Sequence, residues 1–400
     1  MRISPCQCID ESESAEAYRR PFVIDRAAKV HRAAGPKTRE ETVVYTEIEN
    51  SAVGIVGTGS CVPDRVVANS VVAAAAGVTE EWILAKTGIR SRRWAGPGEA
   101  TSDLAIAAAV AAIESAGIDA AEIGWIIVAT VTGDRPQPAT ACRVQDRIGA
   151  VQAAAFDLSS ACAGFVTGLS VAARLIGHRS PSNPAYALVI GADVFSRVVD
   201  PAERRTAVLF GDGAGAVVLG PVPPGRGLVA ADITSHGEYF DMIRVDAGGS
   251  RMPATAGTVE QGLHSLNMDG RATRDFVLRA VPVTVARLLD SAGIAADEID
   301  HVIPHQANGV LLAQLLTQLK LPRARAHRTV GELGNTGAAS IPITLDRCRR
   351  FGCFADGDLL LLTGFGSGMS IGDVVIRWQA TGSSPVARDA QDETTARCQG

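Results

Sequence analysis

A short segment of this chain occurs twice, and this repeat restricts the possible folds more than any other feature of the sequence. Residues 114–128 read ESAGIDAAEIGWIIV and residues 290–303 read DSAGIAADEIDHVI, so the two copies begin 176 positions apart. Both copies have the pattern of a helix end, a loop and a buried strand. Two copies of one α/β unit can bury one face of each sheet against shared helices. We therefore expect a duplicated α/β protein with its functional site between the halves.

The repeat suggests where each half begins and ends. We predict an N-terminal half over residues 51–221 and a C-terminal half over residues 222–380, because Pro and Gly gather between them. Residues 1–50 are rich in Glu, Ser and Arg and predict a flexible N-terminal extension. Residues 381–400 are polar, lack periodicity and predict a flexible tail.

Composition excludes several classes of function. The net charge is −5 and no run of like charges suits nucleic acid or anionic lipid, so we expect neither partner. No stretch reaches the roughly 18 uninterrupted apolar residues of a membrane span. The eight cysteines show no zinc-binding spacing and no signal peptide precedes them. We therefore predict no metal site, no disulfides and a cytoplasmic location.

Cys162 is the first candidate functional residue. The apolar run over residues 153–158 predicts a strand, and apolar residues from Phe165 onward recur at helical spacing. Cys162 is thus expected at the start of a helix, where unpaired N–H groups and the helix dipole would lower the pKa of its thiol. That chemistry suits a nucleophile. A small cysteine that only fills space fits the same stretch equally well.

His305 and Asn335 are the matching candidates in the second half. His305 follows a predicted strand, and Asn335 lies at a predicted helix start within GNTGAAS. Taken alone, the first fits an ordinary loop residue and the second an N-cap. Together with Cys162 they form a Cys/His/Asn set, in which a thiolate attacks an acyl group and N–H groups stabilise negative charge. The glycine-rich turn over residues 364–368 could supply a further backbone donor.

Several separated segments resemble β-ketoacyl-acyl-carrier-protein synthase III, and they cover residues 52–380 in order. The segments are Glu81–Ile83, Thr87–Ile89, Ala161–Phe165, Phe210–Gly215, Pro304–Asn308 and Gly334–Ser340. The resemblance implies an α/β thiolase fold, a five-layered αβαβα arrangement of two pseudo-repeats of mixed sheet, and a homodimer. Other stretches, such as RVQDR over residues 143–147, look closest to actinobacterial members that prime polyketide synthases.

The resemblance also implies roles for individual residues. Cys162 would be acylated, while His305 and Asn335 would hold the malonyl thioester and stabilise the enolate left by decarboxylation. The backbone N–H groups of Cys162 and Ser367 would form the oxyanion hole for acyl transfer.

Further positions are implied around the substrate. The predicted coenzyme A residues are Trp82, Lys86, Arg204 and Asn308, and the predicted acyl-pocket or gate residues are Gln137, Phe210 and Phe365. The sequence departs from the family pattern at several of these places. Lys86 replaces an arginine and loses planar stacking, and Gln137 replaces an aromatic residue. The family's basic carrier-docking positions fall at Asp275, Val310, Thr317 and Gln318.

The main functional hypothesis is an acyltransferase that primes polyketide or fatty acid synthesis. A short acyl-CoA acylates Cys162, and malonyl-acyl-carrier protein then condenses with the acyl group. Coenzyme A thioester is a substrate, and no cofactor is expected. One alternative is an enzyme of the same fold that moves the acyl group to an oxygen or nitrogen acceptor, with His305 as general base. Another is a scaffold without activity.

Overall fold

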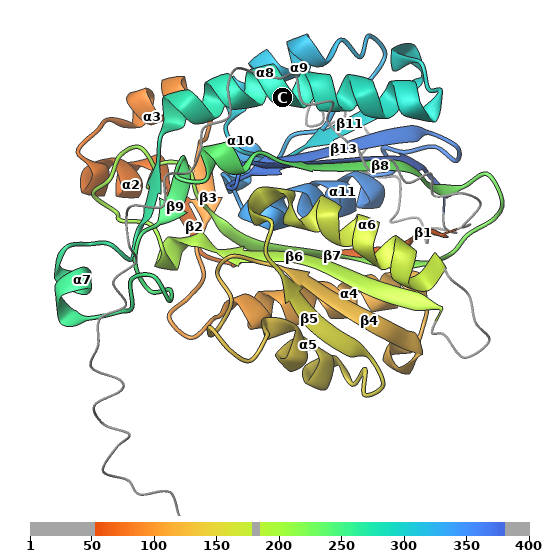
Figure 1. The fold of residues 1–400 in the computed structure, drawn as a ribbon, viewed down its shortest axis with the longest axis horizontal. Coiled ribbons are helices and arrows are strands. Elements are labelled where there is room, and N and C mark those ends of the chain that lie inside the picture. Colours follow the sequence, from red (N-terminus) through yellow and green to blue (C-terminus); the bar gives the residue numbers. More distant parts are fainter. Residues whose placement is uncertain (1–52, 178–184, 381–400) are drawn as a thin grey trace, which may run out of the picture. The chain divides into compact units, whose positions relative to one another are not determined.

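A computed structural model describes residues 53–177 and 185–380, so the predicted extension and tail lie outside the described residues. Two five-stranded mixed sheets dominate this part of the chain (Figure 1). The first sheet has the order β1 (Val53–Cys61), β7 (Asp212–Pro221), β6 (Tyr186–Val194), β4 (Ile123–Ala129), β5 (Ala154–Leu158). The second has the order β8 (Gly227–Ser235), β14 (Ser370–Arg377), β13 (Leu359–Gly366), β11 (His301–Pro304), β12 (Arg325–Ala326).

The two sheets have the same topology. β1, β7 and β6 pair antiparallel, and β6, β4 and β5 pair parallel. β8, β14 and β13 pair antiparallel, and β13, β11 and β12 pair parallel. The strands of the sequence repeat, β4 and β11, therefore hold equivalent places, each between two parallel neighbours. The duplication expected from the sequence is confirmed.

Helices cover both sheets and fill the space between them. The α-helices are α2 (Asn69–Ala76), α3 (Glu80–Thr87), α4 (Thr101–Ala116), α5 (Thr140–Ile148), α6 (Gly164–Gly177), α7 (Ala256–Glu260), α8 (Gly270–Ala292), α9 (Gly309–Leu319), α10 (Val330–Leu333) and α11 (Ser340–Arg350). The short 3₁₀ helices are η1 (Ala120–Glu122), η2 (Ala161–Ala163), η3 (Phe195–Arg197), η4 (Gly237–Tyr239), η5 (Ala296–Glu298) and η6 (Gly337–Ala339). Two small two-stranded antiparallel sheets pair β2 (Val66–Ala68) with β3 (Ser91–Arg93), and β9 (Ile243–Val245) with β10 (Leu266–Met268).

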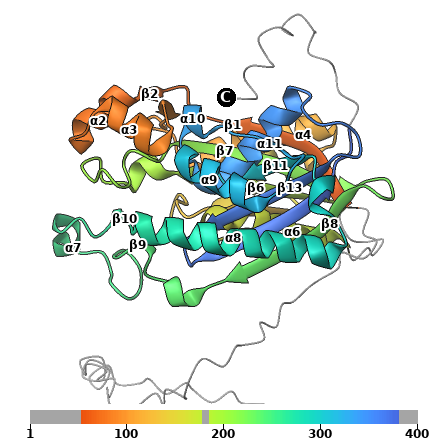
Figure 2. The same ribbon diagram turned by 90° about the horizontal axis from the view of Figure 1, so that it is seen from above.

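The helices complete a five-layered arrangement. α6 and α11 lie between the sheets, and their apolar side chains join one core with both (Figure 1). Alanines of α4 pack on the outer face of the first sheet. α8 begins beside β10 and packs with α9 on the outer face of the second (Figure 2). The αβαβα fold implied by the resemblance is confirmed.

The repeat extends to the two short helices at the centre. η2 at residues 161–163 and η6 at residues 337–339 have the same 176-residue offset, and each leads directly into a middle-layer helix. η2 contacts η6. Polar contacts also join the halves, since the Asp346 carboxylate of α11 accepts hydrogen bonds from Thr58 and Ser60 of β1 at 2.7 and 2.6 Å.

Local sequence signals explain both ends of α3. The Thr79 hydroxyl accepts the Trp82 N–H and starts α3, which ends at Gly88 in a left-handed conformation.

None of the helices in the described ranges is long and apolar enough to cross a membrane.

Candidate active site

Cys162 lies in η2, between the edge strand β5 and the middle-layer helix α6. Ala161 precedes it with a φ of 45°, which is unusual for a residue with a side chain. This sharp turn presents Cys162 toward β13 rather than continuing the line of β5. The residue is partly buried.

Two glycines of β13 allow this close approach. A Cβ added to Gly366 would lie 2.6 Å from the Cys162 nitrogen, and one added to Gly364 would lie 3.0 Å from the Cα of Ala163. Neither position can hold a side chain without moving the backbone of η2. The sequence analysis places both glycines in a turn over residues 364–368, but in the structure they belong to β13 and form one wall around Cys162.

The sequence predicts a lowered thiol pKa for Cys162, and the structure corrects this. Burial raises the pKa of the Cys162 thiol, and the nearby Asp193 carboxylate raises it further. Hydrogen bonding at the backbone of Cys162 opposes the shift, but burial dominates. Cys162 lies in the 3₁₀ helix η2, and burial together with the Asp193 charge outweighs any effect of the helix dipole on its thiol.

His305 lies just beyond β11, and its surroundings fix the ring. The backbone N–H of His305 donates to the Thr363 carbonyl of β13 at 2.8 Å, and the imidazole ring meets the Phe365 ring edge-on with centroids 5.2 Å apart. The Nδ1 atom lies 2.8 Å from the hydroxyl oxygen of Ser340. Only 2% of His305 is exposed, and burial lowers the pKa of its imidazole to about 3. The ring is therefore neutral at physiological pH.

Asn335 is held at both its backbone and its side chain. Its N–H donates to the Leu209 carbonyl at 2.8 Å, and its carbonyl accepts the Gly211 N–H at 3.0 Å. The side-chain oxygen accepts the Gly337 N–H at 2.9 Å. Since the amide oxygen is engaged by this donor, the amide nitrogen is directed elsewhere as a donor. Asn335 also lines a large cavity described below.

The three candidate residues gather around the end of β13 and the helix η6. Cys162 contacts Gly366, His305 packs on Phe365, and the Asn335 side-chain oxygen accepts the N–H of Gly337, the first residue of η6. η2 contacts both β13 and η6. Residues from two sequence halves are thus brought to one place between the sheets, as the repeat predicts.

Asp193, at the end of β6, is a buried polar residue that the sequence analysis missed. Its carboxylate accepts hydrogen bonds from Val131 N–H at 3.0 Å, Thr132 Oγ1 at 2.9 Å, Thr130 Oγ1 at 3.2 Å and Ala338 N–H at 2.9 Å. Burial raises the pKa of Asp193 to about 6 despite these donors. The residue ties η6 to the first sheet, and a single Asp in an apolar strand gave no pattern by which to find it.

Gly337→Ala tests whether this packing holds the site together. The added Cβ would lie 2.2 Å from an Asp193 oxygen and 2.4 Å from the Phe195 ring, at a φ of +59°. We expect the free energy of unfolding to fall by about 2–4 kcal/mol, from overpacking and the left-handed backbone together. Urea denaturation measures it.

Gly293→Ala is the matched control for that variant. Gly293 has a similar φ of +64° but nothing within 4 Å of an added Cβ. It should lose only about 1–2 kcal/mol. Equal losses in the two variants would show that contact with Asp193 is unimportant.

A cavity of about 830 Å³ is lined by Asn335 and by all four predicted coenzyme A residues. Trp82, Lys86 and Arg204 line it, and the two cations are exposed. Asn308 lines it as well, but its amide is already engaged. Its oxygen caps α9 at 2.8 Å from the Val310 nitrogen, and its nitrogen donates to the Lys86 carbonyl at 3.3 Å. Asn308 therefore positions the cavity wall.

Three other residues predicted for the site are Phe210, Phe365 and Ser367, and the structure gives contacts for each of them. Phe210 forms an isolated β-bridge with Asn335 and stacks on Phe195, with ring centroids 4.4 Å apart. Phe365 packs on His305. Ser367 follows Gly366, and its hydroxyl donates to the Ile243 carbonyl at 2.6 Å, so its side chain is turned toward β9.

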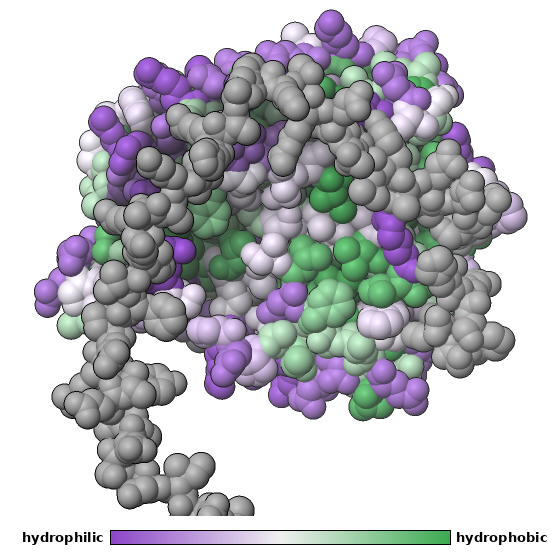
Figure 3. Space-filling model, viewed as in Figure 1, coloured by the Kyte–Doolittle hydropathy of each residue, from purple (hydrophilic) through white to green (hydrophobic). Residues whose placement is uncertain are grey.

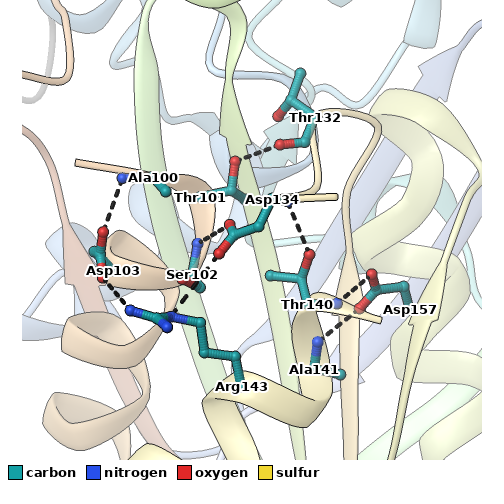
Figure 4. A network of polar contacts seen from close by, with 10 residues as sticks. All are labelled: Ala100, Thr101, Ser102, Asp103, Thr132, Asp134, Thr140, Ala141, Arg143 and Asp157. Atoms are coloured by element: carbon teal, nitrogen blue, oxygen red, sulfur yellow. Dashed lines mark hydrogen bonds and ion pairs between the residues drawn. The ribbon is translucent and has the colours of Figure 1, made fainter. Parts of the chain in front are cut away.

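Gln137 is exposed on the loop between β4 and α5, and it does not line the cavity. Figure 4 shows the polar contacts that hold this loop. Asp157 accepts the N–H groups of Thr140 and Ala141 at 2.7 and 2.8 Å, and the Asp134 N–H donates to the Thr140 hydroxyl at 3.2 Å. The loop is therefore fixed at its base.

Comparison with known proteins gives a consistent result. Residues 156–237 match the family model of 3-oxoacyl-[acyl-carrier-protein (ACP)] synthase III, and residues 289–378 match its C-terminal model. Acetoacetyl CoA synthase NphT7 of Streptomyces sp. (strain CL190) is 51% identical over 326 residues, covering 81% of this chain and 98% of that protein. Beta-ketoacyl-[acyl-carrier-protein] synthase III of Roseiflexus sp. (strain RS-1) is 44% identical over 324 residues, covering 81% of this chain and 98% of that protein.

Solved structures agree with the sequence relatives. FabH, the 3-oxoacyl-(acyl carrier protein) synthase III of Pseudomonas aeruginosa PAO1, matches with a TM-score of 0.72 and 40% identity, covering 82% of this chain and 98% of that one. The priming beta-ketosynthase from the R1128 polyketide pathway matches with a TM-score of 0.75 and 33% identity, covering 82% of this chain and 96% of that one. This chain therefore belongs to the 3-oxoacyl-[acyl-carrier-protein] synthase III family, as an acyl-transferring condensing enzyme with the thiolase fold.

Proposed function

We propose that the protein condenses a short acyl group, delivered by coenzyme A, with a malonyl thioester. The Cys162 thiolate attacks the acyl-CoA carbonyl, the carbon–sulfur bond to coenzyme A breaks, and the coenzyme A sulfur leaves and takes a proton. The N–H groups of Cys162 and Ser367 stabilise the tetrahedral oxyanion. The observation that carries this proposal is the meeting of Cys162, His305 and Asn335 around β13 and η6, beside a cavity that ends at Asn335.

In the second step, a malonyl thioester replaces coenzyme A. Its carbon–carbon bond breaks, carbon dioxide leaves, and the enolate attacks the acyl-cysteine carbonyl and expels the Cys162 thiolate. His305 and Asn335 donate hydrogen bonds to the enolate oxygen. Donation by neutral His305 requires the proton on Nε2, so we assign the Ser340 hydroxyl as the donor to Nδ1 at 2.8 Å. Ser340 is thus a positioning residue.

The charges of the cavity support a phosphate-bearing substrate. Six cations and one acid line it, namely Lys86, Arg204, Arg205, Arg244, Arg271, Arg274 and Asp269. Arg205, Arg244 and Arg274 pair with acidic neighbours. Within residues 53–177 and 185–380, Lys86, Arg204 and Arg271 line the cavity and form no ion pair. Such a cavity favours the phosphates of coenzyme A or of a phosphopantetheine arm.

The two half-reactions should differ in pH dependence. Burial raises the thiol pKa of Cys162, so the thiolate fraction and the acylation rate should rise with pH through the neutral range. Burial lowers the pKa of His305 to about 3, so discharge of the acyl-enzyme should show no histidine-dependent decline down to about pH 5. Rapid-quench mass spectrometry at each pH follows both rates. A pH-independent acylation rate, or a discharge rate that halves near pH 6, would contradict these assignments.

A second candidate uses malonyl-CoA in place of malonyl-acyl-carrier protein. One relative of this chain, 51% identical to it, is an acetoacetyl CoA synthase. The family's basic carrier-docking positions are Asp275, Val310, Thr317 and Gln318 here, and Asp275 pairs with Arg274 at 2.6 Å. A carrier protein is acidic in the family, so this surface offers it little charge attraction. Arg271 and Arg279 on α8 remain as docking residues for the first candidate.

Parallel rate measurements separate the two candidates. Acyl-enzyme is prepared with unlabelled acyl-CoA and divided between malonyl-acyl-carrier protein and malonyl-CoA at matched concentrations, and the product of each is identified by mass. A higher kcat/KM with the carrier protein supports the polyketide- or fatty-acid-priming function. A higher value with malonyl-CoA supports acyl-CoA synthesis. Discharge by an alcohol or amine alone would favour the acyltransferase alternative instead.

The homodimer and the cytoplasmic location stay predictions. β5 is an edge strand, and partly buried apolar residues of β5 and α6 pack against the core from this side. Figure 3 shows hydrophobic side chains gathered on the face over these two elements. Val151, just before β5, is 75% exposed. A second copy that covers this face would also be placed to approach the Gln137 loop. No proposed step uses a metal or a resident cofactor.

A further inference from the structure

A second cluster of reactive side chains lies at the far edge of the second sheet. It contains His327, which follows β12, Cys348 in the last turn of α11, and Cys353 in the loop after α11. Their ligand atoms all lie within 4.8 Å of one another. His327 and Cys348 are buried and Cys353 is partly buried. This group is not evident in the sequence, because His327 stands 21 residues before Cys348.

A chain of polar contacts orients the imidazole of His327. Its Nε2 atom lies 2.9 Å from Nδ1 of His301, and Nε2 of His301 lies 3.0 Å from an Asp358 oxygen. One tautomer satisfies all three groups, with His327 donating to His301 and His301 donating to Asp358. In that arrangement Nδ1 of His327 carries a lone pair. A carboxylate or histidine behind a ligating histidine is the usual means of fixing its tautomer.

The donor set suits a soft or borderline metal. Two cysteine thiolates and one neutral imidazole match the ligands of Zn²⁺, and they cancel its charge. In a zinc site the ligand atoms lie about 3.3–3.8 Å apart, so the three side chains would have to move together by no more than about 1 Å to bind the ion.

The cluster opens to a small cavity. Cys353, His301 and Asp358 line a space of about 380 Å³, together with Arg323 and Arg325. This opening leaves room for water in a fourth coordination position.

We propose that His327, Cys348 and Cys353 form a zinc-class metal site, with His301 and Asp358 as positioning residues behind His327. The site lies outside the condensing centre. The His327 carbonyl accepts a hydrogen bond at 3.2 Å from Gln306, the residue after His305, so a bound metal would steady this segment behind the centre.

Cobalt binding to the full-length protein tests the proposal. The protein is reduced with a phosphine, stripped of metal with a chelator and titrated with Co²⁺. One equivalent should produce the thiolate-to-cobalt charge-transfer band in the near ultraviolet and the visible bands of tetrahedral cobalt. Zn²⁺ should then displace the cobalt, and the charge-transfer band and the visible bands should disappear.

Variants assign the signal to these residues. Cys353→Ser, at a partly exposed position, should lose the charge-transfer band and keep its fold by circular dichroism. His301→Gln should keep the band but weaken binding about 10–100-fold. Cys142→Ser and a double variant with Cys6→Ser and Cys8→Ser are controls, since they remove cysteines elsewhere, and both should bind as the wild type does. Zn²⁺ should raise the thermal midpoint of wild type and controls but not of Cys353→Ser.

Four results would overturn the proposal. The first is the absence of stoichiometric cobalt binding with a thiolate band in the reduced wild type. The second is an unchanged band in folded Cys353→Ser. The third is loss of the band only in the variant at positions 6 and 8, which would move the metal to the N-terminal residues. If reduction is omitted and peptide mapping finds Cys348 joined to Cys353 with no metal binding after reduction, the pair is a redox couple and the metal site is wrong.

Discussion

Cys162→Ala is expected to abolish acylation by any acyl-CoA and to reduce condensing activity by more than about 10⁴-fold. In the proposed reaction the Cys162 sulfur is the protein atom that forms a covalent bond to the acyl group. The substitution removes one sulfur at a partly buried position beside Gly366, so the fold should be preserved. Intact-protein mass after incubation with acyl-CoA measures acylation, and product formation from a malonyl thioester measures condensation.

Cys142→Ala is the matched control, because Cys142 is an exposed cysteine on α5. It should retain the acyl mass and the activity of the wild type. Acyl mass that persists in Cys162→Ala would assign the nucleophile to another residue. Loss of acylation in both variants would point to a general effect of cysteine removal.

Asn335→Asp is expected to leave acylation of Cys162 nearly unchanged and to slow discharge by a malonyl thioester about 10²–10³-fold. A carboxylate still accepts the Gly337 N–H that now lies 2.9 Å from the Asn335 oxygen, so the local structure should hold. It cannot donate to the enolate, however, and its negative charge opposes the charge that develops there. Single-turnover discharge of pre-formed acyl-enzyme isolates this step from acylation.

Asn267→Asp provides the comparison. Asn267 is an exposed residue that lines the same cavity. Asn267→Asp therefore adds the same negative charge to the cavity wall but leaves the Asn335 amide unchanged. Its discharge rate should fall much less than that of Asn335→Asp. Equal losses would mean that the charge of the cavity, not hydrogen-bond donation by Asn335, controls the second step.

The sequence predicts much of this architecture because duplication leaves a visible trace. The two copies of the helix–loop–strand segment become α4–β4 and α8–β11, and β4 and β11 occupy equivalent places in matching sheets. Cys162, His305 and Asn335 could be selected because residues at equivalent strand ends of two such halves meet. The cap at Thr79 was also predictable, since it depends only on neighbouring residues.

Features that depend on packing could not be predicted. Asp193 is a lone acid in an apolar strand, and only the fold surrounds it with four donors. The sign of the Cys162 pKa shift depends on burial and on Asp193, neither of which its local sequence contains. His327 and Cys353 likewise come together only because β12 and α11 end at the same edge of the second sheet.

Two-step mass spectrometry of Cys162 tests the central claim most directly. The protein is first mixed with a panel of short acyl-CoA thioesters, and the acyl-enzyme is then chased with a malonyl thioester labelled in its free carboxyl group. We predict one acyl group on Cys162, followed by its loss together with release of labelled carbon dioxide and formation of a β-ketoacyl thioester. An acyl-enzyme that the malonyl thioester cannot discharge, or discharge without labelled carbon dioxide, would contradict the proposed condensation.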